Sequence, residues 1–151
     1  MLNKLQKNRG GFTLVEIMIV VAIIALLAAI AVPNFLRARK RSQATKVLED
    51  LRILNDAVSQ YAVDTNKSTG ATFGWPDLQN YVKKDTALYS SFSADGVRVN
   101  DLFGNPYCTT SKIDQPDPDC GDVCVNRATF NALSDVADSS FWSPFGIQPG
   151  S

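Results

Sequence analysis

The sequence predicts an α+β protein in which one long N-terminal helix packs on a small C-terminal antiparallel sheet. Two observations predict the helix. Residues 17–32 are sixteen consecutive apolar residues, and apolar residues then recur at helical spacing from Ala44 to Tyr61. A third observation predicts the sheet: beyond residue 107 several Gly, Pro and Ser residues punctuate the chain, which suits a small antiparallel sheet of three or four strands against the helix.

The first apolar segment is long enough to cross a membrane. From Phe12 to Leu36 it holds 25 residues with four interruptions, whereas a bilayer core requires about 20 apolar residues. A soluble domain of this size cannot cover a helix that is apolar on every side. We therefore expect residues 12–36 to form a transmembrane helix.

Three interpretations of this segment are open from the pattern alone. The first is a single-pass anchor. The second is a secretory signal peptide cleaved after Ala31, because Ala29–Ala31 has the A-x-A pattern, although the apolar run exceeds the usual length of about 7–15 residues. The third depends on Glu16, because a carboxylate in a spanning segment is costly and usually has a partner. No basic residue lies within the run, so this partner is expected from another chain.

The second half of the predicted helix is amphipathic. Its apolar stripe consists of Ala44, Val47, Leu51, Leu54, Val58 and Tyr61, and is widened by Leu48, Ala57 and Ala62. We expect residues 37–63 to continue the first helix and to bury this stripe against a C-terminal domain formed by residues 64–151. Pro33 lacks an N–H, so it is expected to kink or loosen one helical turn.

Composition excludes most enzyme chemistry. The 151 residues include no histidine, which excludes Ser-His-Asp and Cys-His hydrolases and His-ligated metal sites. The 15 basic and 15 acidic side chains are segregated, with a charge of +6 in residues 1–41 and −6 in residues 42–151. The basic cluster in residues 37–41 is expected to contact lipid headgroups. Nucleic-acid binding is the less favoured interpretation, because no aromatic residues interleave with this cluster.

A seven-residue segment, Gly-Gly-Phe-Thr-Leu-Val-Glu at residues 10–16, follows a short basic leader. This segment resembles the processing signature of type IV pilins and type II secretion pseudopilins. The resemblance implies that a prepilin peptidase removes residues 1–11 by cutting after Gly11 and methylates the new N-terminus, Phe12. It also implies roles in assembly for Glu16, the fifth residue after the cut, and for Pro33, the twenty-second.

The resemblance further implies a pilin-like fold and a homo-oligomeric filament. In such a filament, the Glu16 carboxylate of one subunit would pair with the Phe12 ammonium group of an incoming subunit. The implied partners are other copies of the chain, the prepilin peptidase and an inner-membrane assembly platform. Before assembly the subunit would cross the inner membrane once, with the leader in the cytoplasm. Residues after about 36 would lie in the periplasm or at the cell surface.

Residues 101–107, Asp-Leu-Phe-Gly-Asn-Pro-Tyr, are similar to the D-x-W-G-N-P-Y segment of the major pseudopilin of type II secretion, with Phe103 in place of tryptophan. This similarity favours a pseudopilin that acts in protein export over a type IV pilus subunit for adhesion, motility or DNA uptake. A membrane-anchored or secreted extracytoplasmic binding domain is the alternative of a different class. Elsewhere, residues 75–82 are expected to form a short helix with Pro76 in its first turn, and residues 97–99 a strand after the Asp95–Gly96 turn.

Three cysteines in an extracytoplasmic domain predict one disulfide and one free thiol. The spacing favours Cys108–Cys124 across a hairpin, and Cys108–Cys120 is nearly as compatible with it. A redox centre is not expected, because the spacing is C-x3-C rather than C-x-x-C.

Four carboxylates lie within nine residues, at Asp114, Asp117, Asp119 and Asp122. Oxygen ligands at this density suit calcium, and the resemblance implies a calcium loop near the C-terminus. However, two prolines interrupt any EF-hand spacing, so a solvated acidic loop without a cofactor is the favoured interpretation.

Overall fold

The computed structural model describes residues 11–92, 98–113 and 120–149. Its main element is the helix α1, Leu14–Asp64, which has 51 residues. The chain divides into two compact units, one ending at Arg37 and the other formed by Ala38–Ser151. The α-helix continues through Pro33, so this proline does not end it.

The part of α1 within the first unit exposes apolar side chains on all of its faces. Large apolar side chains from Phe12 to Leu36 are 50–82% exposed. Within the described residues, α1 is the one helix long and apolar enough to cross a membrane, and its most apolar window has a mean hydropathy of 3.0. These properties fit the expected transmembrane segment, since lipid would cover the side chains that no protein contact covers.

The part of α1 within the second unit is amphipathic, as the spacing predicts. All six residues of the predicted stripe are buried, together with Leu48 and Ala57, while Ala62 is partly buried against the same core. Burial of one stripe is what holds such a helix to a domain, because propensity alone contributes little. The predicted amphipathic helix is thus confirmed.

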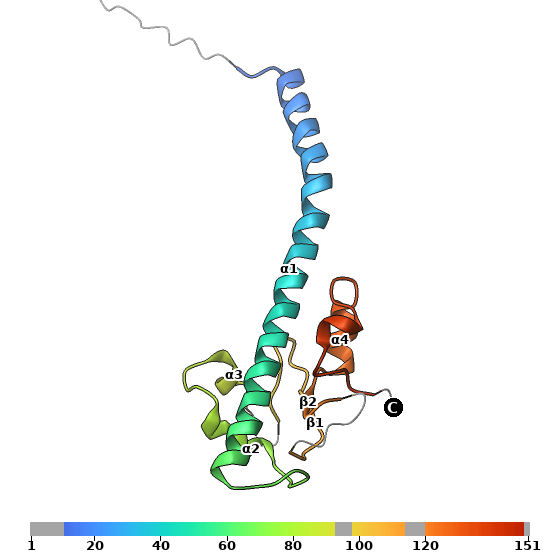
Figure 1. The fold of residues 1–151 in the computed structure, drawn as a ribbon. Helices are drawn as coiled ribbons and strands as arrows, with labels where there is room; N and C mark the ends of the chain where they lie inside the picture. The colour runs from blue at the N-terminus through green and yellow to red at the C-terminus, as the bar shows by residue number, and fades with distance from the viewer. Residues whose placement is uncertain (1–10, 93–97, 114–119, 150–151) are drawn as a thin grey trace, which may run out of the picture. The chain divides into compact units, whose positions relative to one another are not determined.

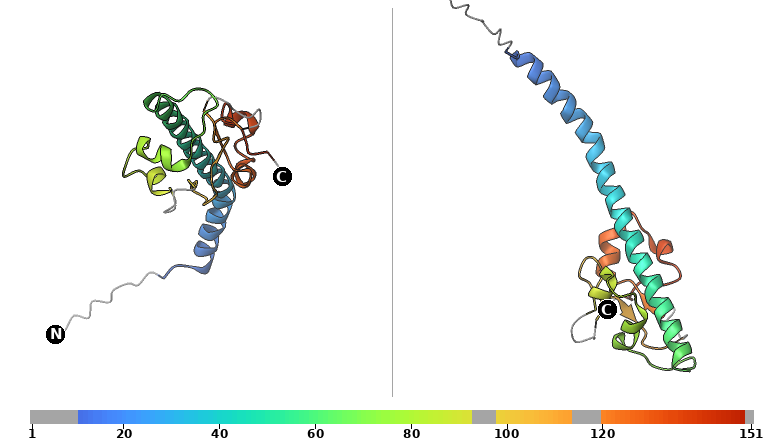
Figure 2. Two further views of the ribbon diagram at one scale, coloured as in Figure 1. Left: turned by 90° about the horizontal axis from the view of Figure 1, so that it is seen from below. Right: turned by 90° about the vertical axis from the view of Figure 1, so that its left-hand side faces the viewer.

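The rest of the second unit consists of short elements around α1. They are α2 (Trp75–Leu78), η1 (Gln79–Tyr81), α3 (Ala87–Ser90), β1 (Cys108–Thr109), β2 (Val123–Cys124), α4 (Arg127–Leu133) and η2 (Ser139–Trp142). Figure 1 and Figure 2 show α2 and α3 on one side of α1, with β1, β2 and α4 on the other. The predicted helix at residues 75–82 is confirmed as α2 followed by η1.

The expected number of strands is wrong for the part of the chain that the structure describes. There the sheet has two antiparallel strands, β1 and β2, in which Cys108 pairs with Cys124 and Thr109 with Val123. Other segments pair only through isolated bridges, such as Phe92 with Val99. Proline cannot donate to a strand ladder and glycine weakens a strand, so a segment rich in both favours short pairings. Short helices and turns therefore cover much of the core.

The core of the second unit is one cluster of buried side chains. Leu51 and Leu54 of α1 and Trp142 of η2 are each 0% exposed and are among its largest members. Trp75 of α2 is also buried, at 8% exposed. Both tryptophans of the chain therefore report on the packing of this unit.

Candidate functional site

The start of α1 holds three of the residues that the sequence singles out for processing and assembly. Gly11 and Phe12 precede the helix in an exposed segment without regular structure, and Phe12 is 82% exposed. A Cβ atom added to Gly11 would meet no atom within 4 Å. The fold of the described chain therefore does not require glycine here, which is the expected result if an external enzyme selects the residue.

Glu16 lies in the first turn of α1 and forms a capping box with Thr13. The backbone N–H and the hydroxyl of Thr13 each donate to Glu16 Oε2 at 3.0 Å. In return, the backbone N–H of Glu16 donates to Thr13 Oγ1 at 3.3 Å. This reciprocal pattern satisfies backbone donors that a helix start leaves unpaired. The T-x-x-E spacing at the start of an apolar run signals this capping box, which was not among the features predicted from the sequence.

No cation of the described chain pairs with Glu16. Among the described residues the ion pair present is between Lys40 and Asp135, whose Nζ and carboxylate oxygens are 3.0 Å apart. The prediction that Glu16 pairs with a positive group of another chain therefore stays a prediction. What the structure adds is that two neutral hydrogen-bond donors already hold the carboxylate within its own subunit.

The Lys40–Asp135 ion pair joins α1 to the segment after α4 within the second unit. Both side chains are about half exposed, at 43% and 51%, so solvent screens the pair. Arg41 lies beside it and lines an open hollow of about 380 Å³ together with Asp135 and Asp138. Hydrogen bonds from Ser140 and from the backbone of Phe141 lower the pKa of Asp138. Lys40, a member of the basic cluster at residues 37–41, thus already forms an ion pair within the subunit.

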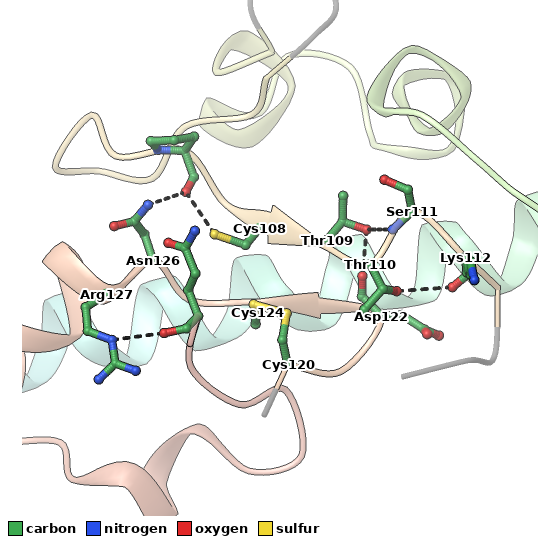
Figure 3. Close-up of a disulfide and its surroundings, with 12 residues drawn as sticks. Cys108, Thr109, Thr110, Ser111, Lys112, Cys120, Asp122, Cys124, Asn126 and Arg127 are labelled. Atoms are coloured by element: carbon green, nitrogen blue, oxygen red, sulfur yellow. Dashed lines mark hydrogen bonds between the residues drawn. A yellow bond between two sulfur atoms is a disulfide. The ribbon is translucent and has the colours of Figure 1, made fainter. Parts of the chain in front are cut away.

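The predicted disulfide pairings are both wrong. The disulfide joins Cys120 to Cys124, with an S–S distance of 2.04 Å and a Cα–Cα distance of 5.2 Å, and Cys108 is free (Figure 3). The spacing did place Cys108 opposite Cys124, because the two are partners in the β1–β2 pair. However, the Cys108 thiol is directed to the Pro106 carbonyl at 3.9 Å, and burial raises its pKa.

Cys108 and Cys120 approach Cys124 in different ways. The Thr110 N–H donates to the Asp122 carbonyl at 3.3 Å, so Thr110 and Asp122 form a hydrogen-bonded pair. Two residues along, Cys108 and Cys124 are again such a pair, in which opposite side chains lie further apart than in the alternate pairs. The turn after Cys120 instead brings this residue close to Cys124.

The acidic cluster falls mostly outside the described residues. Asp114, Asp117 and Asp119 lie there, and Asp122 is described. The Asp122 carbonyl accepts from the Thr109 hydroxyl at 2.7 Å, which ties this residue to β1. Among the described residues no group of three or more Cys, Asp or Glu side chains is placed to hold a metal ion.

Residues 101–107 form a turn around a buried carboxylate. Asp101 is 7% exposed, and its Oδ1 accepts from the backbone N–H groups of Phe103 at 2.8 Å and Asn105 at 2.9 Å. Its Oδ2 accepts from the Thr129 hydroxyl of α4, which in turn accepts from Asn105 Nδ2 at 2.9 Å. The hydrogen bonds of Asp101 and Asn105 to Thr129 thus connect this turn to α4. The sequence did not indicate the contribution of Thr129.

The next residue of interest in this segment is Tyr107, which reaches α1. Its hydroxyl donates to Asp50 Oδ2 at 3.1 Å. Burial raises the pKa of Asp50, and the Tyr107 hydrogen bond and Lys46 oppose this shift. The pKa of Tyr107 is also raised, chiefly by burial. The hydrogen bond therefore joins the turn at residues 101–107 to α1 within the second unit.

Comparison with known proteins gives matches to the N-terminal segment and to longer parts of the chain. Residues 6–32 match the family model described as the prokaryotic N-terminal methylation motif. The type II secretion system core protein G of Aeromonas hydrophila is 34% identical over 109 residues, which are 68% of this chain and 74% of that protein. No solved structure shows significant similarity to the chain.

Two pilins are also similar to the chain. The type IV wide pilus major component PilA4 of Thermus thermophilus is 50% identical over 66 residues, which are 42% of this chain and 48% of that protein. The type IV major pilin protein PilA of Myxococcus xanthus is 32% identical over 125 residues, which are 82% of this chain and 51% of that protein. The chain therefore spans about half the length of each of these two pilins.

Proposed function

Because this chain belongs to the family of type IV pilins and type II secretion pseudopilins, we propose that it is a structural filament subunit, and specifically a pseudopilin that acts in protein export. The start of α1 carries this proposal. An exposed Gly11–Phe12 bond precedes the apolar part of α1, and Glu16, in the first turn, is the one carboxylate of residues 12–36. Members of this family are structural subunits, which agrees with the expectation that the chain is not an enzyme.

Processing is the first step of the proposed function. A prepilin peptidase cuts after Gly11 and methylates the α-amino group of Phe12. Removal of residues 1–11 takes away three basic side chains, so the mature subunit has 12 basic and 15 acidic side chains and a charge of −3. The exposed, non-helical placement of Gly11 and Phe12 supports this step, because a protease requires an accessible extended chain.

Assembly is the second step, and Glu16 directs it. The new ammonium group of Phe12 is four residues from Glu16 in the same chain, and in a filament it would meet the Glu16 carboxylate of a neighbour. Each charge would then relieve the cost of burying the other, which neutral donors do only in part. The Thr13 hydrogen bonds would hold the carboxylate in the unassembled subunit and release it to the incoming cation.

The expected location and partners follow from this sequence of steps. Before assembly the apolar part of α1 crosses the inner membrane, and residues after about 36 lie outside the cytoplasm. A disulfide in the second unit fits an oxidising compartment. The partners are the prepilin peptidase, the inner-membrane assembly platform and other copies of the chain.

The type IV pilus subunit remains the second candidate, and one observation favours it. The match to the Myxococcus xanthus pilin covers 82% of this chain, more than the 68% covered by the match to the Aeromonas hydrophila core protein G. The D-x-F-G-N-P-Y segment at residues 101–107 favours the pseudopilin instead. Deletion of the gene discriminates the two: loss of secreted enzymes from the culture medium supports the pseudopilin, and loss of surface filaments and surface motility supports the pilus subunit.

The filament proposal is tested with a matched pair of glutamate variants. Glu16→Ala is expected to leave cleavage intact and to abolish filaments recovered by shearing, whereas Glu49→Ala removes an exposed carboxylate from the same helix and should leave filaments normal. N-terminal sequencing of the mature protein is the second readout. A methylated Phe12 supports the proposal, while Val32 or Met1 at the N-terminus would establish a signal peptide or a simple anchor.

A further inference from the structure

The segment that follows α1 contains an acceptor pattern for a covalent modification. Asn66-Lys67-Ser68 has the N-x-S spacing of an N-glycosylation acceptor, which is used where it lies in an exposed loop of an exported protein. Every residue in the stretch 63–69 is exposed. The pattern therefore meets its structural requirement here, unlike a chance match inside a helix or in the core.

Asn66 lies in the turn that ends the helix. Its φ of 50° is left-handed, a conformation that asparagine adopts more readily than most residues at a helix C-terminus. Its N–H donates to the Val63 carbonyl at 3.2 Å, and the next N–H, of Lys67, donates to the Ala62 carbonyl at 3.0 Å. The turn thus presents the Asn66 side chain on a backbone that the helix end holds in place.

The side chain between the two acceptor residues is committed to the domain. The Lys67 ammonium donates to the Tyr61 hydroxyl and to the Thr72 carbonyl, the latter at 3.2 Å, and lies 4.7 Å from the centre of the Tyr61 ring. By contrast, the Asn66 carboxamide and the Ser68 hydroxyl make no hydrogen bond within the described ranges of the chain. The Asn66 carboxamide and the Ser68 hydroxyl, which an N-glycosylation acceptor requires, are therefore available, while Lys67 between them is held by its hydrogen bonds.

A hollow beside Asn66 is lined by both apolar and polar side chains, which suits contact with a sugar ring. It has a volume of about 450 Å³ and is lined by Ser59, Ala62, Val63, Asn66 and Lys67. Val63 is apolar and 79% exposed, although it lies in the second unit and outside the predicted membrane segment. A sugar ring has apolar C–H faces and polar edges, so it would cover Val63 and keep its hydroxyls near Ser59 and solvent.

We propose that Asn66 is an N-glycosylation site whose donor is an oligosaccharide linked to a polyprenyl diphosphate. In the transfer, the Asn66 amide nitrogen forms a bond to C1 of the first sugar. The bond from C1 to the diphosphate oxygen breaks, the polyprenyl diphosphate leaves with the electron pair, and the amide loses one proton to a base of the transferase. The proposal rests on the proposed function to the extent that residues after about 36 must lie outside the cytoplasm.

The test is intact-mass and peptide mass spectrometry of the full chain purified from the cells that make it. The expected result is a mass above that of the methylated polypeptide by whole sugar residues, located on the peptide that contains Asn66. Asn66→Gln and Ser68→Ala should each remove the increment. Ser68→Thr should keep it, because threonine retains the hydroxyl, and so should Asn80→Gln, which alters an exposed asparagine outside the N-x-S pattern.

The same spectra separate failure of this proposal from failure of the filament proposal. A protein that begins at methylated Phe12 and carries no increment on Asn66 overturns the glycosylation site and leaves the filament subunit intact. An increment that survives Asn66→Gln overturns it as well, since the sugar would then be linked to another residue. A glycosylated chain that still begins at Met1 would support the site and contradict the processing step.

Discussion

Replacement of Thr129 by valine tests how the buried carboxylate of Asp101 is stabilised. The Thr129 hydroxyl, on a residue that is 0% exposed, donates to Asp101 Oδ2 and accepts from Asn105 Nδ2 at 2.9 Å. Valine has nearly the same shape, so Thr129→Val removes these two hydrogen bonds without leaving a cavity. The Asp101 oxygen then loses its donor while the residue stays buried.

The expected cost follows from these contacts. A buried polar group left without its partner costs about 1–3 kcal/mol, and more when the group is charged. The lost hydrogen bond from Asn105 adds about 1 kcal/mol. We therefore expect Thr129→Val to lower the free energy of unfolding by roughly 2–4 kcal/mol, which for a domain of this size corresponds to a decrease in Tm of roughly 10–20 °C.

The assay is urea or thermal unfolding of the full chain in detergent micelles, followed by tryptophan fluorescence. Both tryptophans, Trp75 and Trp142, are buried in the second unit, so the signal reports on its unfolding. Thr45→Val is the matched control, because the exposed Thr45 hydroxyl donates only to the Arg41 carbonyl of its own helix. This control should change the free energy by no more than about 0.5 kcal/mol. If Thr129→Val is no more destabilising than the control, the hydroxyl does not stabilise the carboxylate.

Four further outcomes are expected. Burial raises the pKa of Asp50, so between the two pKa values the folded state holds a proton that the unfolded chain has released. The contribution of Asp50 to the free energy of unfolding therefore falls as pH rises from about 4 through the raised pKa. Asp50→Asn should remove this pH dependence, which urea titrations at several pH values measure. Alkylation of the unfolded, non-reduced protein should label Cys108 alone, and a label on Cys120 or Cys124 would contradict the observed disulfide. Calcium should raise the Tm of the full chain no more than magnesium does, if the acidic segment is a solvated loop. Filament recovery should fall as ionic strength rises, because salt would screen an attraction between the basic part of one subunit and the acidic part of its neighbour. Filaments indifferent to salt would argue against such an attraction.

Periodic features of the fold could be predicted because they depend on neighbours along the chain. The stripe from Ala44 to Tyr61 required only the 3.6-residue period, and all six of its residues are buried. The helix at Trp75 required only a proline in its first turn. In both cases one segment carries the whole signal, so a single sequence is enough.

The features that were predicted wrongly or missed depend on how segments far apart in the sequence contact each other. The disulfide was wrong because the choice between Cys108 and Cys120 depends on the register of β1 and β2 and on the turn after Cys120. The contact between Asp101 and Thr129 joins residues 28 positions apart, and no local pattern specifies it. The prediction of three or four strands was wrong for a related reason, since strand pairing requires a partner at the correct register over several residues.

The capping box at the start of α1 changes the interpretation of Glu16. From the sequence, Glu16 was an uncompensated carboxylate in a membrane segment, which required a partner in another chain. The structure supplies two donors from Thr13 within the same subunit, so one oxygen of the carboxylate accepts two hydrogen bonds while its charge has no partner among the described residues. A cation of another subunit would compensate this charge, and the described residues place none beside Glu16. Thr13→Val should therefore weaken the subunit in the membrane before assembly, while Glu16→Ala should block assembly itself, and pulse-chase measurement of subunit lifetime against filament yield distinguishes these two defects.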